Sequence, residues 1–235
     1  MREETKTNGD SPEILRKFKE IITTLENLKG MLSKRDLEEA RKLAKQKEEE
    51  IKSSYLASRI LDKLRKITDD ASKENLRKEV NEIVEKLNSI VSTAEDLLLS
   101  ARSVQADEGK KRGYEQAMEK AEKVAEALTD ISKNKLREYF DQVKTLNTEV
   151  KMKKNPIEAK VEIRKAMMKL RARVYYDSAR PGLGAVKDFR PIIDAFVAVM
   201  NKWGDKEDKD IKNDLQGFCD FLECLVGYHY VYAEK

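Results

Sequence analysis

Apolar residues recur at three- and four-residue intervals along nearly the whole chain, which is the period of an amphipathic helix. In the first part of the sequence this pattern predicts a helix that ends near residue 30, a long second helix over 34–67 and a third from 72 towards 106. A shorter helix is expected to follow, up to about residue 131. Helices of this kind bury their apolar faces against one another, so we expect a bundle or an antiparallel coiled coil here.

The same period continues from Ser132 to the C-terminus. Asn155 and Pro156 form a strong helix start, because Asn caps a helix N-terminus and Pro suits its first position. Further helices are expected over 188–203 and in the last 25 residues or so. The sequence therefore predicts an all-α fold in two parts: a long-helix, coiled-coil-like N-terminal extension (1–131) and a small C-terminal bundle of four or more helices (132–235).

Charge is distributed unevenly over these helices, although the net charge of the chain is only +4. Residues 1–131 contain 27 basic and 28 acidic residues, whereas residues 133–190 contain 16 basic against 7 acidic. Residues 191–235 are acidic, with 5 basic against 9 acidic. A basic face on two or three neighbouring helices indicates an anionic partner.

On the helix that follows Pro156, four residues fall within about 60° of one another beside the apolar stripe. They are Lys160, Arg164, Arg171 and Tyr175. In a chain with 39 % charged residues, such a strip is ordinarily a solvated helix face. The concentration of basic residues favours contact with a nucleic-acid backbone, and contact with an acidic protein stays open as the alternative.

The C-terminal stretch FCDFLECLVGYHYVY contains the only histidine, His229, and both cysteines. His229 falls on the apolar stripe of the last helix, so we expect it in the core; the core residues predicted around it are Tyr175, Phe218, Leu222, Leu225 and Tyr232. A helical ribonuclease of the HEPN class would need an arginine shortly before the histidine, and none is present there. We therefore expect no enzyme activity, no cofactor and no metal. The N-terminus lacks a signal-peptide pattern and no apolar run approaches about 18 residues, which predicts a cytoplasmic protein without membrane contact.

Three segments in order, LRARVYYDSAR, VKDFRPIIDAF and FCDFLECLVGYHYVY, resemble the small subunit of type III-A CRISPR effector (Csm) complexes. The resemblance covers roughly residues 132–235 and implies a non-catalytic helical bundle for antiviral defence. Its implied partners are guide RNA, target RNA, the large subunit, the backbone subunits and further copies of itself. It implies RNA-backbone contacts through Lys151, Lys153, Lys154, Lys169, Arg171, Arg173 and Arg180. Members of that family are generally much shorter, so residues 1–131 are a departure, and a protein-binding helical adaptor without RNA contact is the alternative function.

Overall fold

The computed structural model describes residues 12–33, 36–67, 69–100, 113–203 and 208–233. These residues form helices and turns without a strand, which confirms the predicted all-α class. No helix among them is long and apolar enough to cross a lipid bilayer. The helices are α1 (Glu13–Ser33), α2 (Leu37–Gln46), α3 (Glu48–Ile51), α4 (Tyr55–Lys66), α5 (Asp70–Ser100), α6 (Gly113–Ala127), α7 (Lys133–Met152), α8 (Pro156–Ala179), the 3-10 helix η1 (Gly184–Phe189), α9 (Arg190–Asn201) and α10 (Asp208–Tyr232).

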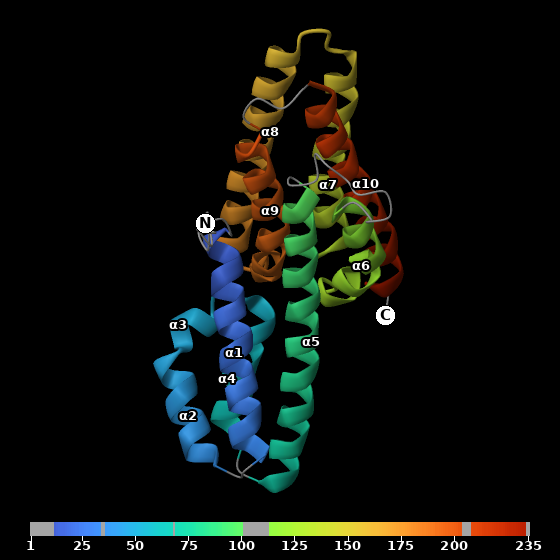
Figure 1. Ribbon diagram of the computed structural model, residues 1–235. Coiled ribbons are helices and arrows are strands. Elements are labelled where there is room, and N and C mark those ends of the chain that lie inside the picture. The colour runs from blue at the N-terminus through green and yellow to red at the C-terminus, as the bar shows by residue number, and fades with distance from the viewer. Residues whose placement is uncertain (1–11, 34–35, 68, 101–112, 204–207, 234–235) are drawn as a thin grey trace, which may run out of the picture.

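The molecule is elongated, and α5 runs through its middle (Figure 1). Helices α1 to α4 pack around one half of α5 at one end, and the α7–α8 hairpin forms the opposite end. Helices α6 and α9 pack against the other half of α5, and α10 covers α6 and α7. Helix α5 therefore connects the N-terminal helices to the C-terminal ones.

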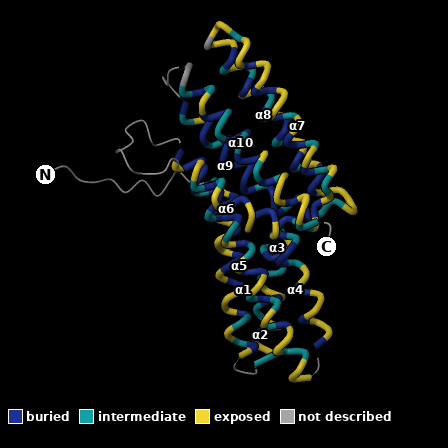
Figure 2. Tube along the Cα trace, turned by 90° about the vertical axis from the view of Figure 1, so that its right-hand side faces the viewer, coloured by how far each residue is buried: buried dark blue, intermediate teal, exposed yellow. Residues whose placement is uncertain are grey.

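One continuous hydrophobic core runs along the long axis (Figure 2). It includes Phe18 of α1 and Phe218 of α10, which belong to the two different parts expected from the sequence. Its aromatic centre is formed by Phe196 and Phe218, whose rings stack with their centroids 4.1 Å apart. The division at residue 131/132 is not visible as a break in this core, and it stays a prediction.

The prediction of a single long helix over 34–67 is wrong, because the chain forms α2, α3 and α4 there. Ser54 is extended (φ −108°, ψ 138°) and its Oγ accepts a hydrogen bond from the backbone N–H of Ala57, so a new helix begins at that point. The carboxylate of Asp188 accepts two further backbone N–H groups from the first turn of α4. A helix start held by a residue this distant in sequence is invisible to local periodicity.

Helix α6 packs unusually close to its neighbours because of two glycines. A Cβ atom at Gly113 would lie 2.2 Å from the carbonyl oxygen of Asp96, so only glycine permits this approach of α6 to α5. A Cβ atom at Gly217 of α10 would lie 2.5 Å from the ring of Tyr114 of α6. These contacts tie α6 to both the N-terminal and the C-terminal helices.

Candidate RNA-binding surface on helices α7 and α8

The α7–α8 hairpin is anchored by a helix cap and an apolar inner face. Oδ1 of Asn155 accepts hydrogen bonds from the backbone N–H groups of Ile157 (3.0 Å) and Glu158 (3.4 Å), as the Asn-Pro start signal predicts. The inner face of α8 consists of Ile163, Met167, Leu170 and Val174, none more than 2 % exposed. Because this face is fixed, the orientation of the basic residues of α8 is fixed as well.

The end of the hairpin carries the first group of predicted RNA contacts. Lys151 and Lys154 are exposed, and neither forms an ion pair with an acidic residue among those the structure describes. Lys153 differs, because its Nζ lies 2.7 Å from a carboxylate oxygen of Glu162. This end therefore presents two uncompensated ammonium groups and one that is paired.

The outer face of α8 adds two more uncompensated charges. Lys165 and Lys169 are exposed, lie one helical turn apart and have no ion pair within the described part of the chain. Lys169 was expected from the sequence, whereas Lys165 was missed. The signal for Lys165 was its four-residue spacing from Lys169, which places both on one face outside the predicted strip.

The predicted strip itself faces α9. Arg171 forms an ion pair with Asp194 of α9 (Nε to Oδ1, 2.7 Å), and the hydroxyl of Tyr175 donates to Oδ2 of the same carboxylate at 2.6 Å. Arg164 donates to the backbone carbonyl of Met200 at 3.0 Å. Burial raises the pKa of Tyr175 to about 12, and the hydrogen bond to Asp194 raises the pKa of Arg171. Arg171 thus serves helix packing in this structure, and Tyr175 is half-buried rather than fully in the core.

Lys160 belongs to the same predicted strip and is half-buried, so it is not a fully solvated cation. The strip as a whole is thus only partly open to solvent. Sequence spacing correctly placed its members on one side of α8, but it could not show that α9 covers much of that side.

Arg173 and Arg180 are tethered to the buried carboxylate of Asp177. Arg173 pairs with Glu138 of α7 and lies 3.9 Å from Asp177, while Arg180 lies 3.8 Å from Asp177. Asp177 also accepts a hydrogen bond from the hydroxyl of Tyr139 at 2.8 Å. Both arginines remain about half exposed, so their outward N–H groups can still reach an anion.

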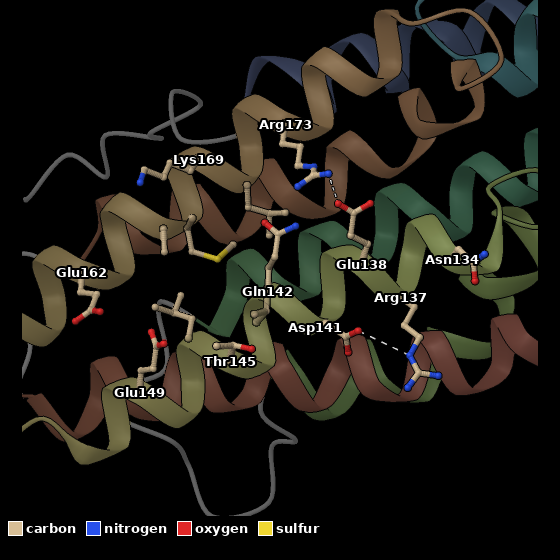
Figure 3. Close-up of a pocket in the computed structure, with 15 residues that line it drawn as sticks. Asn134, Arg137, Glu138, Asp141, Gln142, Thr145, Glu149, Glu162, Lys169 and Arg173 are labelled. Atoms are coloured by element: carbon tan, nitrogen blue, oxygen red, sulfur yellow. Dashed lines mark ion pairs between the residues drawn. The ribbon is translucent and has the colours of Figure 1, made fainter.

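A groove of about 720 Å³ runs between α7 and α8 (Figure 3). Its floor is apolar, and Arg173 reaches across it from α8 to Glu138 on α7. The charged residues that line it are Arg137, Lys169 and Arg173 against Glu138, Asp141, Glu149 and Glu162. With four carboxylates to three cations, the groove has no excess of positive charge to attract phosphate. A polyanion is therefore directed to the outer edge of α8 and the hairpin end rather than into the groove.

The predicted core residues of α10 are buried at Phe218, Leu222 and Leu225. His229 is 1 % exposed, and its Nε2–H donates to the backbone carbonyl of Leu128 at 3.0 Å. Burial lowers the pKa of His229. Tyr232 is only half-buried, because its hydroxyl reaches outward to Glu122 at 2.6 Å. Within the described ranges, no cluster of three or more His, Cys, Asp or Glu residues could hold a metal ion.

A comparison with known protein families relates the C-terminal part of the chain to a described family. The model of the family Csm2 Type III-A matches residues 111–235, which is slightly more than half of the chain. The match begins with α6 rather than at residue 132, in agreement with the close packing of α6 on α10. Comparisons with curated proteins and with solved structures gave no match.

Proposed function

Because the chain belongs to the Csm2 Type III-A family, the small subunit of the type III-A CRISPR effector (Csm) complex, we propose that it contacts the RNA of that complex through the α7–α8 hairpin. In this role it lines the groove in which guide RNA pairs with target RNA, and it takes no part in catalysis. Its partners are then the guide and target RNA, the large and backbone subunits and further copies of itself.

The observation that supports RNA contact is a set of exposed lysines on the α7–α8 hairpin that have no ion pair within the described ranges. Lys151, Lys154, Lys165 and Lys169 form no ion pair with any described acidic residue, although ion pairs are common elsewhere on this surface. We call these four residues the hairpin lysines. Base pairing supplies the sequence specificity in RNA-guided complexes, so a protein that lines the duplex needs only to neutralise phosphates.

A second candidate function is a protein-binding adaptor, and one observation favours it. Met152, Ile157 and Val161 lie beside the hairpin lysines and are 80 %, 74 % and 61 % exposed. Apolar side chains contribute little to phosphate binding, whereas they suit a partner protein. The two functions can share the hairpin, since an effector subunit contacts both RNA and neighbouring subunits.

The test uses the complex assembled with guide RNA. Lys165→Ala/Lys169→Ala should weaken binding of target RNA by about threefold to tenfold, because two phosphate contacts are lost. The matched control is Lys42→Ala/Lys45→Ala on α2, which removes the same charge at the opposite end of the molecule (Figure 1). Equal affinity of both variants and the wild type, with assembly intact, would contradict RNA contact and leave the adaptor function.

A further inference from the structure

A second basic region lies at the junction of the N-terminal helices with α8 and α9, away from the hairpin lysines. A cleft of about 680 Å³ opens there between the first turn of α1, the turn before α4, and helices α8 and α9. The charged residues that line it are Lys17, Arg171, Arg190 and Lys202 against Glu13 and Asp194. Counted over these lining residues, cations outnumber carboxylates by two, unlike in the groove between α7 and α8.

Among these cations, Arg190 hydrogen-bonds to backbone carbonyls, and the carboxylates of Asp188 and Asp194 act on it from a distance. It is half-buried, and its guanidinium donates only to two backbone carbonyls, from Nε to Lys187 at 3.2 Å and from Nη2 to Ser53 at 2.5 Å. No acidic residue in the described ranges forms an ion pair with it. Burial lowers the pKa of Arg190, which shows that its charge is poorly solvated. A half-buried guanidinium that donates to backbone carbonyls and packs on the Tyr175 ring is stabilised further when an anion binds beside it.

Arg171 supplies donors to the same place. The guanidinium carbons of Arg171 and Arg190 lie 5.1 and 5.3 Å from the centroid of the Tyr175 ring, so both groups surround one aromatic side chain. The ion pair with Asp194 uses Nε of Arg171 and the Tyr175 hydroxyl interacts with the same guanidinium, but the side chain stays 38 % exposed, so its outward N–H groups can reach a ligand. Both oxygens of Asp194 are occupied by Arg171 and Tyr175, so this carboxylate is already compensated.

We propose that this cleft binds a phosphoryl group, carried either by a free phosphate compound or by an RNA backbone. Forked guanidinium donors match the geometry of phosphate oxygens, and a charge of −1 to −2 matches the excess of the cleft. The first turn of α1 also lines the cleft, and the N-terminus of a helix favours an anion. The site lies largely outside the proposed RNA-contacting surface and does not depend on it.

The test is calorimetric titration of the full chain with pyrophosphate and, separately, with a single-stranded RNA of six nucleotides, at constant ionic strength. Lys17→Gln/Arg190→Gln should weaken binding about tenfold or more, since two charge-assisted contacts are lost. The matched control is Lys86→Gln/Lys123→Gln, which removes two lysines that line a separate cavity between α5 and α6. This control should bind both probes within about twofold of the wild type.

Arg190 also supports the chain at Ser53, so its replacement could unfold the junction. Lys17→Glu serves as the second variant, because Lys17 is exposed and its ion pair within the described ranges is to Glu13 on its own helix. It should lower the affinity at least threefold by reversing one charge of the cleft.

Saturable binding of pyrophosphate that is lost in the cleft variants supports a site for free phosphate compounds. Binding of the hexanucleotide alone, lost in the same variants, supports contact with an RNA backbone. Absence of saturable binding of either probe, or equal losses in the control variant, overturns the site. If Lys165→Ala/Lys169→Ala impairs target binding in the complex while the cleft variants bind like the wild type, this inference fails and the proposed function stands.

Discussion

Asp188 caps helix α4 from 132 residues further along the chain: its Oδ2 accepts the backbone N–H of Leu56 at 2.9 Å, and its Oδ1 accepts that of Tyr55 at 3.1 Å. Two neighbours strengthen this junction. Lys187 donates to the carbonyl of Lys52 at 3.0 Å, and Arg190 donates to that of Ser53. Four hydrogen bonds that link Lys187, Asp188 and Arg190 to residues 52–56 thus join the helices outside the family match to those inside it.

Asp188→Ala should lower the free energy of unfolding of the full chain by about 2–4 kcal/mol, because it leaves buried backbone N–H groups of α4 without an acceptor. Urea unfolding at pH 7, followed by circular dichroism, measures this loss. Asp36→Ala is the control: Asp36 caps α2 through the N–H of Glu39 at the surface, so about 1 kcal/mol is expected there. A smaller loss at Asp188 than at Asp36 would show that the junction contributes little to stability.

Asp188 should also make stability depend on pH. Burial raises its pKa from 3.8 to about 6 in the folded protein, so the folded state binds the proton more tightly than the unfolded state. The stability from this group is therefore full below pH 3.8 and is lost as the pH rises through 6. Between pH 4 and 7, the free energy of unfolding of the wild type should fall by roughly 3 kcal/mol relative to Asp188→Asn, which does not titrate. A constant difference between the two proteins over this range would refute the linkage.

His229 should make stability depend on pH in the opposite direction, so that stability falls as the pH falls. Its pKa is lowered by burial, so its contribution to stability is present above the unfolded pKa of about 6.5 and is lost as the pH falls. His229→Gln should cost about 1–2 kcal/mol at pH 7, since the hydrogen bond to Leu128 is weakened, and it should leave any activity of the assembled complex within a few-fold of the wild type. Complete loss of that activity in a folded, assembled variant would indicate a chemical role for the imidazole.

Local periodicity predicted much of this structure, because the spacing of apolar residues within one or two turns determines which face of a helix is buried. The inner face of α8, the Asn155 cap and the buried position of His229 all follow from residues within one or two turns. The features that periodicity missed depend on contacts with residues far away in the sequence. The break before α4 is held by Asp188, and Arg171 is turned to α9 by Asp194, which lies on a different helix. A helical wheel shows which residues share a side but not which helix covers that side.

The boundary at residue 132 can be tested with two fragments. Residues 132–235 contain twelve of the fifteen aromatic residues and were expected to fold alone. Residues 111–235 also include α6, which packs on α10, and the turn after α6, where the carbonyl of Leu128 accepts the hydrogen bond from His229. We expect both fragments to be helical by circular dichroism and the longer one to resist more urea. Unfolded behaviour of the shorter fragment alone would move the boundary to the start of α6.

The salt dependence of target binding should separate the hairpin lysines from Arg171. Counterion release gives a log–log slope of about −0.7 for each phosphate neutralised on a single strand, so Lys165→Ala/Lys169→Ala should flatten the slope of the assembled complex by about 1.4. Arg171→Ala should flatten the slope by about 0.7 at most, the value for one phosphate, and only if the cleft beside Arg171 holds the RNA backbone. Otherwise Asp194 simply holds the guanidinium against α9 and the slope is unchanged. In either case Arg171→Ala should lower stability, since Asp194 is buried and loses its cationic partner. Target RNA titrated at four or more salt concentrations gives the slopes for all three proteins. A flatter slope only in Arg171→Ala would place the RNA contact on the predicted strip, and three equal slopes would favour protein partners for both surfaces.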